Sequence, residues 1–177
     1  AWLAGRFGPA EMRLTRAVGG QSNPTWFLDY GERRLVLRKK PAGPILKGAH
    51  AVEREFRVLS ALADTPLPVP RPVALEEAEE VIGTPFYLMD RIEGRVFDDA
   101  ALPGLAPQER RAIYLAMAET LAALHRIEPA QVGLGDYGRP EGYFARQVRR
   151  WGGQMDASPG PVPAELTELR AAVAAAL

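Results

Sequence analysis

The chain contains no cysteine, and His50 and His125 are its only histidines. The absence of cysteine excludes disulfides, thiolate nucleophiles and zinc–thiolate sites, and it fits a reducing compartment. Basic residues and acidic residues number 22 each, so the net charge is zero and no field of one sign attracts nucleic acid or anionic lipid. Any anion site in this protein must therefore be local.

Long apolar runs are missing as well. No stretch approaches the roughly 18 apolar residues that a membrane span needs, and the N-terminus lacks the charged-then-apolar pattern of a signal sequence. Hydrophobic residues make up 47% and charged residues 25% of the chain, which is ordinary for a globular protein. We expect a soluble, cytoplasmic protein without a membrane partner, and we expect both ends to be cut because the last residues stop inside a helix-like run.

The segment from Gly19 to Lys40 carries the first functional signal. A polar turn, GGQSN, precedes two strand-like runs, Thr25–Leu28 and Leu35–Arg38, which predict a hairpin with a dense cationic end. A glycine pair beside small polar residues lets backbone N–H groups approach an anion. The same pentapeptide is also common as a plain turn.

The end of this hairpin and the helix that follows predict an ion pair. Strand alternation places Val36 and Arg38 on one face and Lys39 on the other. Residues 49–63 have apolar side chains at helical spacing, and Glu55 falls within their stripe. Because an unpaired buried carboxylate is costly, we predict that Arg38 pairs with Glu55. The alternative is that Glu55 lies at the rim of the stripe and pairs with a neighbouring arginine or with water.

The order of elements predicts an α+β protein. A strand precedes the hairpin, and two more follow the helix after a connector with proline at every second residue, giving five antiparallel strands and one helix. We predict a sheet-rich lobe over residues 1–92, and a connector and incomplete helical lobe over 93–177. The helices of the second lobe are expected from Pro107, from Tyr143 and near Ala164.

Several segments together resemble one protein family. In chain order they are GGQSNPTWFL, RLVLRKKPAG, AVEREFRVLSAL, LPVPRP, FYLMDRIEGR, LAALHRIEP and VGLGDYGRPEGYFARQVRRW. They resemble the aminoglycoside phosphotransferase family, most closely its branch related to the kinase-like domain fused to certain acyl-CoA dehydrogenases. The similarity runs from about Met12 to Met155 and implies a protein-kinase-like fold in which the five-stranded lobe binds ATP, with Mg²⁺ as the accompanying metal ion.

The resemblance also implies the residues of the site. Arg38 would hold the nucleotide phosphates and Glu55 would orient it, with Lys39 as the competing cation. Val36 would lie beside the adenine ring. The residues implied to cover the triphosphate are Gly20, Gln21, Ser22 and Asn23, and the implied hinge runs from Met89 to Ile92, with the backbone of Asp90 and Ile92 at the adenine edge.

Parts of the family's catalytic apparatus are absent from this sequence. Phosphoryl transfer in the family uses a His-Gly-Asp motif with a nearby Asn and a later metal-binding Asp, and neither occurs here. We therefore predict no catalytic residue and no metal ligand in this chain, inactivity when it stands alone, and Mg²⁺ ligands beyond Leu177. Asp136 receives no role, His125 is expected to be packed, and Asp98–Asp99 is expected to be a loop or cap feature.

The acceptor is less constrained than the nucleotide. The resemblance implies that the acceptor is a hydroxyl group of a small molecule, such as a hydroxyacyl-CoA-like compound. One alternative is an aminoglycoside-type antibiotic as the acceptor. The other is that the protein is a non-catalytic, kinase-like nucleotide-binding module. Arg146, Arg149 and Arg150 could meet an anionic acceptor, although a solvated helix face is the favoured interpretation. Neutral charge and the lack of an aromatic platform argue against nucleic-acid binding by the cationic run. The sequence does not determine the oligomeric state.

Overall fold

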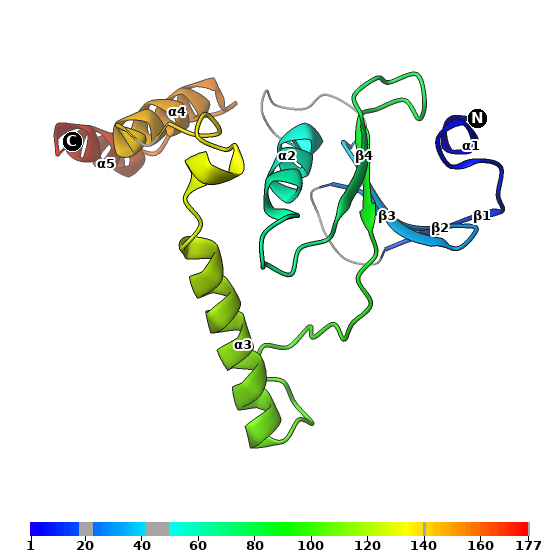
Figure 1. Ribbon diagram of the computed structural model, residues 1–177. Coiled ribbons are helices and arrows are strands. Elements are labelled where there is room, and N and C mark those ends of the chain that lie inside the picture. Colours follow the sequence, from blue (N-terminus) through cyan, green and yellow to red (C-terminus); the bar gives the residue numbers. More distant parts are fainter. Residues whose placement is uncertain (18–22, 42–49, 140, 177) are drawn as a thin grey trace. The chain divides into compact units, whose positions relative to one another are not determined.

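The protein forms one five-stranded antiparallel sheet flanked by helices (Figure 1). The computed structural model describes residues 1–17, 23–41, 50–139 and 141–176. The strand order is β1-β2-β3-β5-β4, and the strands are β1 (Met12–Arg16), β2 (Thr25–Tyr30), β3 (Arg33–Lys39), β4 (Pro72–Glu76) and β5 (Phe86–Asp90). The prediction of five antiparallel strands is confirmed. Gly20, Gln21 and Ser22 lie outside the described residues.

The β2–β3 hairpin has the register that its turn dictates. Tyr30 pairs with Arg33 across a two-residue turn, in which Gly31 has φ +55°. Such tight hairpin turns need positive φ, which glycine adopts at little cost. The same register sets Thr25 opposite Arg38, and Arg38 lies opposite Tyr87 of β5. Three residues from three strands therefore form one row across the sheet.

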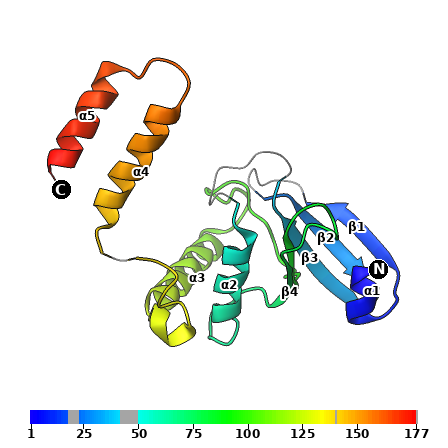
Figure 2. The same cartoon turned by 90° about the horizontal axis from the view of Figure 1, so that it is seen from above.

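One face of the sheet carries an apolar core covered by α1 (Trp2–Phe7) (Figure 2). Leu28, Leu35 and Leu88 on this face are each no more than 1% exposed. Trp2 packs edge-on against Phe86 with ring centroids 5.2 Å apart, and its indole N–H donates to Glu76 Oε2 at 2.6 Å. The sequence did not predict α1, because its six residues include a glycine and are too few to show a helical stripe.

The opposite face is covered by α2 (Val52–Leu62), which packs against β4 and β5. Val52 is fully buried, and Phe56 lies 5.9 Å from the ring of Tyr87. The predicted helix began earlier, at residue 49. His50 has φ +57° and Ala51 has ψ +82°, neither of which is helical, so the helix begins only at Val52.

In the described part of the chain, four helical elements follow the sheet. They are α3 (Pro107–His125), the 3₁₀ helix η1 (Pro129–Val132), α4 (Tyr143–Ala157) and α5 (Ala164–Ala175). Pro107 occupies the first turn of α3, as predicted, because its missing N–H has no helical partner there. The helix predicted from Tyr143 begins at that residue and ends at Ala157. Within it, Gly152 leaves room for the Arg170 guanidinium of α5, since an added Cβ would lie 2.7 Å from Arg170 Cζ.

The chain divides into two compact units, Ala1–Gly133 and Leu134–Leu177. The lobe boundary after residue 92 remains a prediction. Among the described residues, no helix combines the length and the apolar character that crossing a lipid bilayer requires.

Two expectations about single residues have different outcomes. His125 was expected to be packed, and this is wrong. It is the exposed last residue of α3, a helix in which none of the described side chains is buried. Asp99 behaves as expected for a loop cap, because its Oδ1 accepts the Ala101 N–H at 2.8 Å.

Candidate functional site

The centre of the candidate site is an ion pair between β3 and α2. Arg38 Nε donates to Glu55 Oε2 at 2.9 Å, and Arg38 Nη2 donates to Glu55 Oε1 at 3.2 Å. The two side chains are 29% and 35% exposed, so the pair is half-buried rather than solvated. The predicted pairing is therefore present, and it is bidentate, the geometry in which a guanidinium and a carboxylate orient each other best.

Three further residues complete the hydrogen bonding of this pair. Tyr87 Oη donates to Glu55 Oε2 at 2.9 Å, and Asn23 Nδ2 donates to Glu55 Oε1 at 2.7 Å. Arg38 Nη1 donates to Thr25 Oγ1 at 3.3 Å. Tyr87 is 2% exposed and Asn23 is 5% exposed. The carboxylate is thus held by Asn23, which precedes β2, by Arg38 of β3 and by Tyr87 of β5, so three separate segments fix its position.

These contacts determine the charge states of Arg38, Glu55 and Tyr87. Burial alone would raise the pKa of Glu55, but hydrogen bonds from Arg38 and Tyr87 and the charge of Arg38 outweigh it and lower that pKa below its ordinary value. Burial alone would lower the pKa of Arg38. The hydrogen bond to Glu55 and the charge of Glu55 outweigh the effect of burial, so the pKa of Arg38 is raised. Burial and the adjacent carboxylate raise the pKa of Tyr87. Arg38 and Glu55 are therefore charged at neutral pH, while Tyr87 remains a neutral donor.

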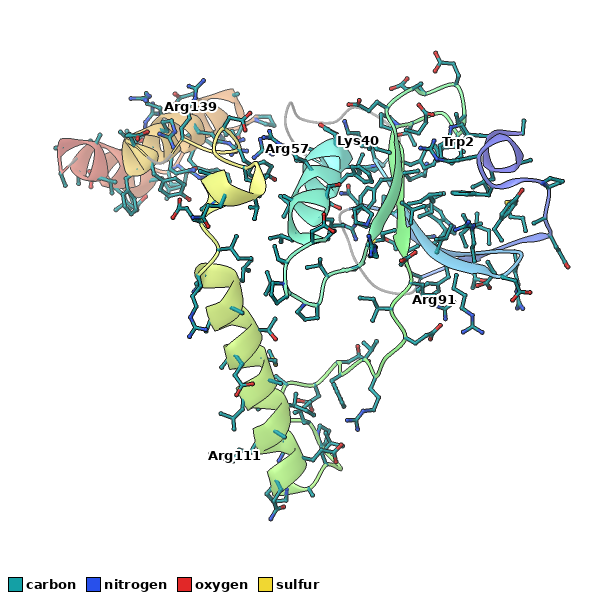
Figure 3. All side chains as sticks on the ribbon, viewed as in Figure 1. Trp2, Lys40, Arg57, Arg91, Arg111 and Arg139 are labelled. Atoms are coloured by element: carbon teal, nitrogen blue, oxygen red, sulfur yellow. The ribbon has the colours of Figure 1, made fainter. Side chains whose placement is uncertain are left out.

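Lys39 lies apart from this cluster. It follows Arg38 in β3, so its side chain is on the opposite face, where its Nζ is 5.9 Å from the centroid of the Trp26 ring. Lys40 Nζ pairs with Glu53 Oε2 at 3.1 Å on the α2 side of the sheet, whereas Trp2 marks the α1 side (Figure 3). Of the three consecutive cations, Arg38 alone contacts Glu55 among the described residues.

An apolar strip lies beside the ion pair on the same face. Val36, two residues before Arg38, pairs across the sheet with Phe27 of β2 and Met89 of β5. Val36 is 8% exposed and Met89 is half-buried. A flat apolar group could therefore rest on this strip with its polar end toward Arg38.

The segment that leaves β5 is tied to the neighbouring strands. Asp90 N–H donates to the Arg71 carbonyl at 2.9 Å, and Arg91 N–H donates to the Arg34 carbonyl at 3.0 Å. The Arg91 guanidinium lies 4.3 Å from the centroid of the Phe27 ring, and its Nε is 3.3 Å from Glu93 Oε1 (Figure 3). The segment of the predicted hinge is thus hydrogen-bonded through its backbone to Arg71 and to Arg34.

Sequence reasoning did not identify all the residues of the cluster. Tyr87 and Thr25 could have been found, because strand alternation and hairpin register place them in one row with Arg38. His50 could not, since its contact, Nδ1 to Asn23 Oδ1 at 3.0 Å, joins segments 27 residues apart. Asn23 was predicted to cover phosphates, but its amide is bonded to Glu55 and to His50.

The described residues include no group of three or more His, Asp or Glu side chains that could hold a metal ion. In the second unit, Arg146 donates to the backbone carbonyls of Arg139 and Glu141, and Arg150 stacks on Trp151 at 5.6 Å. Arg146 is thus partly engaged by its own loop.

Comparison with known proteins identifies the family. The sequence model of the phosphotransferase enzyme family matches residues 13–177. The chain belongs to the phosphotransferase enzyme family. The resemblance predicted from the motifs is thereby confirmed for nearly the whole chain.

Similar proteins confirm both the branch and the fold of this phosphotransferase-family chain. Acyl-CoA dehydrogenase family member 11 of Rattus norvegicus is 46% identical over 149 residues, which are 84% of this chain and 19% of that protein. A crystal structure from Ralstonia eutropha JMP134, provisionally assigned as an aminoglycoside phosphotransferase, is 39% identical with a TM-score of 0.73 and covers 96% of this chain and 49% of its own. The chain thus spans about a fifth of the first relative and about half of the second.

A more distant structure shares the fold. It is a thermostable mutant of aminoglycoside phosphotransferase APH(4)-Ia in a ternary complex with AMP-PNP and hygromycin B. Its TM-score is 0.51 at 21% identity, and the match covers 73% of this chain and 39% of that one. The predicted α+β, kinase-like fold is confirmed.

Proposed function

We propose that this chain is the nucleotide-binding part of an ATP-dependent phosphotransferase that phosphorylates a hydroxyl group of a small molecule. The observation that carries the proposal is the bidentate pair of Arg38 and Glu55, presented beside an apolar strip of the sheet in a phosphotransferase-family fold. Phosphoryl transfer is catalysed mainly by positioning and charge neutralisation, so a cation that is held in a fixed direction is a feature that it needs.

Arg38 would hold the phosphates. Its guanidinium has five N–H donors; Glu55 accepts two and Thr25 accepts one, which leaves two for a ligand among the described contacts. A guanidinium binds phosphate oxygens through such paired donors. Glu55 would act by fixing the direction in which they point.

The adenine ring would lie on the strip formed by Phe27, Val36 and Met89. The N–H groups of Asp90 and Arg91 are both bonded within the sheet. We therefore assign the adenine edge to the Asp90 carbonyl and the Ile92 N–H. Gly20, Gln21 and Ser22 would cover the triphosphate, and we assign Asn23 to anchoring the end of that turn on Glu55, since its buried amide is already bonded there.

Nucleotide binding can be tested directly on the 177-residue chain. Replacing Arg38 by alanine is expected to weaken Mg–ATP binding by tenfold or more, on the order of what loss of a charged hydrogen bond costs. Lys39→Ala is the matched control, because it removes a cation one residue away on the opposite face, and it should leave affinity nearly unchanged. Isothermal titration calorimetry measures both. Equal affinity of wild type and Arg38→Ala would contradict the assignment, and reversed effects would transfer it to Lys39.

The catalytic proposal concerns a longer protein. We expect Mg²⁺ ligands and the His-Gly-Asp motif to lie outside this sequence, and the 177-residue chain to hydrolyse or transfer no phosphate. The name of the Rattus norvegicus relative refers to acyl-CoA, and on that ground we propose a hydroxyacyl-CoA-like acceptor. The names of the structural neighbours favour an aminoglycoside instead.

The two acceptor classes can be separated by one assay. A longer protein carrying this segment is incubated with Mg–ATP and either hydroxyacyl-CoA compounds or aminoglycosides, and ADP release is followed. Turnover with the acyl compounds alone supports the first proposal, and turnover with aminoglycosides alone replaces it with the second. Nucleotide binding without turnover in either case would identify a non-catalytic nucleotide-binding module. Transfer by the 177-residue chain itself would contradict the need for the missing motif.

A further inference from the structure

His50 has a backbone conformation that is unfavourable for a histidine. Its φ is +57°, and among the described residues only Leu102 is another non-glycine residue with positive φ. Glycine or asparagine would adopt this conformation more cheaply than histidine. Backbone strain of this kind concentrates at functional positions, where the surrounding structure holds the residue in place.

The hydrogen bonds around His50 determine which ring nitrogen remains for a ligand. Glu55 is an ionised carboxylate and only accepts, so the Asn23 atom facing it must be the amide nitrogen. The other atom of that amide, Oδ1, therefore faces His50 Nδ1 at 3.0 Å and can only accept. Nδ1 must carry the proton, which leaves Nε2 as the atom that can bind a ligand.

The chain of contacts connects this nitrogen to the nucleotide site. One amide side chain, Asn23, separates the His50 ring from Glu55, and Glu55 is bonded directly to Arg38. A phosphate held by Arg38 is then expected within reach of the same corner of the sheet. We propose that His50 Nε2 is a phosphate ligand, and that the imidazole takes up a proton from solvent when the nucleotide binds, becoming a second cation beside Arg38.

The proposal rests on the proposed function, because it deepens the nucleotide site rather than adding another. The charged and titratable groups of the adjoining elements are largely paired with one another: Glu53 with Lys40, Glu55 with Arg38 and Tyr87, and Lys39 with the Trp26 ring. Arg54, in the first turn of α2, also has an interaction partner. A bound phosphate is the group that would alter the charge balance at His50.

His50→Asn separates the ligand role from a purely structural one. Asparagine tolerates positive φ and can donate its amide N–H near the position of Nδ1, but it has no counterpart of Nε2. We expect His50→Asn to retain the folding stability of the wild type while weakening Mg–ADP and Mg–ATP binding by about tenfold near neutral pH, as loss of a charged hydrogen bond predicts. Adenosine affinity should not change. His50→Gly, which keeps the backbone conformation, is the second variant and should weaken phosphate binding equally.

The pH profile is the readout that a structural role would not move. Wild-type affinity for Mg–ADP should decrease as the pH rises, because a neutral imidazole binds phosphate less tightly than a charged one, while the affinity of His50→Asn should follow only the titration of the nucleotide itself. ¹⁵N NMR of the imidazoles should show His50 doubly protonated when Mg–ADP is bound. His125, the chain's other histidine, is an internal control whose signal should not respond.

The outcomes distinguish this inference from the proposed function. If the wild type does not bind Mg–ADP, or if Arg38→Ala binds it with the same affinity as the wild type, the proposed nucleotide site at Arg38 is wrong. If Arg38→Ala loses binding while His50→Asn matches the wild type in affinity and pH profile, the nucleotide site stands and His50 is only a support for Asn23. Equal loss of adenosine and Mg–ADP binding in His50→Asn would also overturn the phosphate assignment.

Discussion

Glu55 shows how a single side chain can fix the positions of its neighbours. Its two oxygens accept hydrogen bonds from Arg38, Tyr87 and Asn23, at distances between 2.7 and 3.2 Å. A half-buried carboxylate with this many donors stays ionised and cannot rotate without breaking several bonds. The direction of the Arg38 guanidinium is therefore fixed by the protein itself, which would reduce the entropy lost if Arg38 binds phosphate as proposed.

Tyr87→Phe tests the neutral member of this cluster. Tyr87 is 2% exposed and donates to Glu55 at 2.9 Å, so removing its hydroxyl should lower the free energy of unfolding by about 1 kcal/mol. Urea unfolding measures this value. Tyr30→Phe is the matched control, because Tyr30 is 5% exposed and donates at 2.8 Å to the Gly8 carbonyl, away from Glu55. Only Tyr87→Phe should also weaken Mg–ATP binding, and equal affinity of the two variants would contradict the link to the ion pair.

Glu55→Gln tests the pH dependence that the ion pair imposes. The pKa of Glu55 is lowered in the folded state from its ordinary value of 4.5. Its contribution to stability is therefore fully present above that ordinary value and is lost as the pH falls through the lowered folded-state value. In Glu55→Gln this group no longer titrates, so the difference in unfolding free energy between wild type and variant should shrink below about pH 4. A difference that stays constant from pH 7 to pH 3 would argue against the shift.

At the scale of elements, the segment after β5 is fixed to the hairpin by one arginine. Arg91 stacks 4.3 Å from the Phe27 ring centroid, and it pairs with Glu93 at 3.3 Å and with Asp29 at 3.8 Å. Its side chain is 27% exposed, whereas that of Arg34, which also pairs with Glu93, is 68% exposed. Half-buried stacked cations contribute more than exposed ion pairs do.

Arg91→Ala is accordingly expected to loosen this segment more than Arg34→Ala does. The cost of Arg91→Ala should be about 1 kcal/mol in unfolding free energy, and that of Arg34→Ala within about 0.5 kcal/mol of zero. Amide hydrogen exchange of residues 90–92 should accelerate in Arg91→Ala and remain as in wild type in Arg34→Ala. If both variants behave alike, the exposed pair and the stacked one are equivalent and the segment is held by its backbone bonds alone.

At the scale of the whole molecule, burial is concentrated in the first unit. The sheet strands and α2 hold most of the buried side chains, whereas Gly152 is the one buried residue among the described parts of α4 and α5. Helices without a buried apolar face are only marginally stable. The two compact units should therefore differ in stability.

Hydrogen exchange can measure that difference on the intact chain. Amides of β5, the strand between β3 and β4 that contains the fully buried Leu88, should exchange slowest. Amides of α4 and α5 should exchange at least tenfold faster, because they can open without disrupting the core. Uniform protection across both units would show that the chain unfolds as one cooperative body.

Much of the fold and part of the site were predictable because they depend on local periodicity. Alternation along β3 separated Arg38 from Lys39, and helical spacing turned Glu55 inward, so the ion pair between them could be anticipated. The short α1 and the late start of α2 could not, since neither a six-residue helix nor a positive φ at His50 leaves a periodic signal. The packing of His125 was predicted wrongly because an apolar stripe indicates which side of a helix is apolar but not whether another element covers it.

The sequence by itself determined three things: the strands of the sheet, the face of the sheet on which each β3 side chain lies, and the membership in a phosphotransferase family. These follow from the spacing of residues and from motifs within short segments. Only the tertiary structure decided how the site is held. It brought Tyr87 of β5 and Asn23, which precedes β2, into contact with Glu55, and it placed His50 in contact with Asn23. Such contacts join residues that are far apart along the chain. They form because α2 packs on the sheet, and no local sequence pattern predicts them.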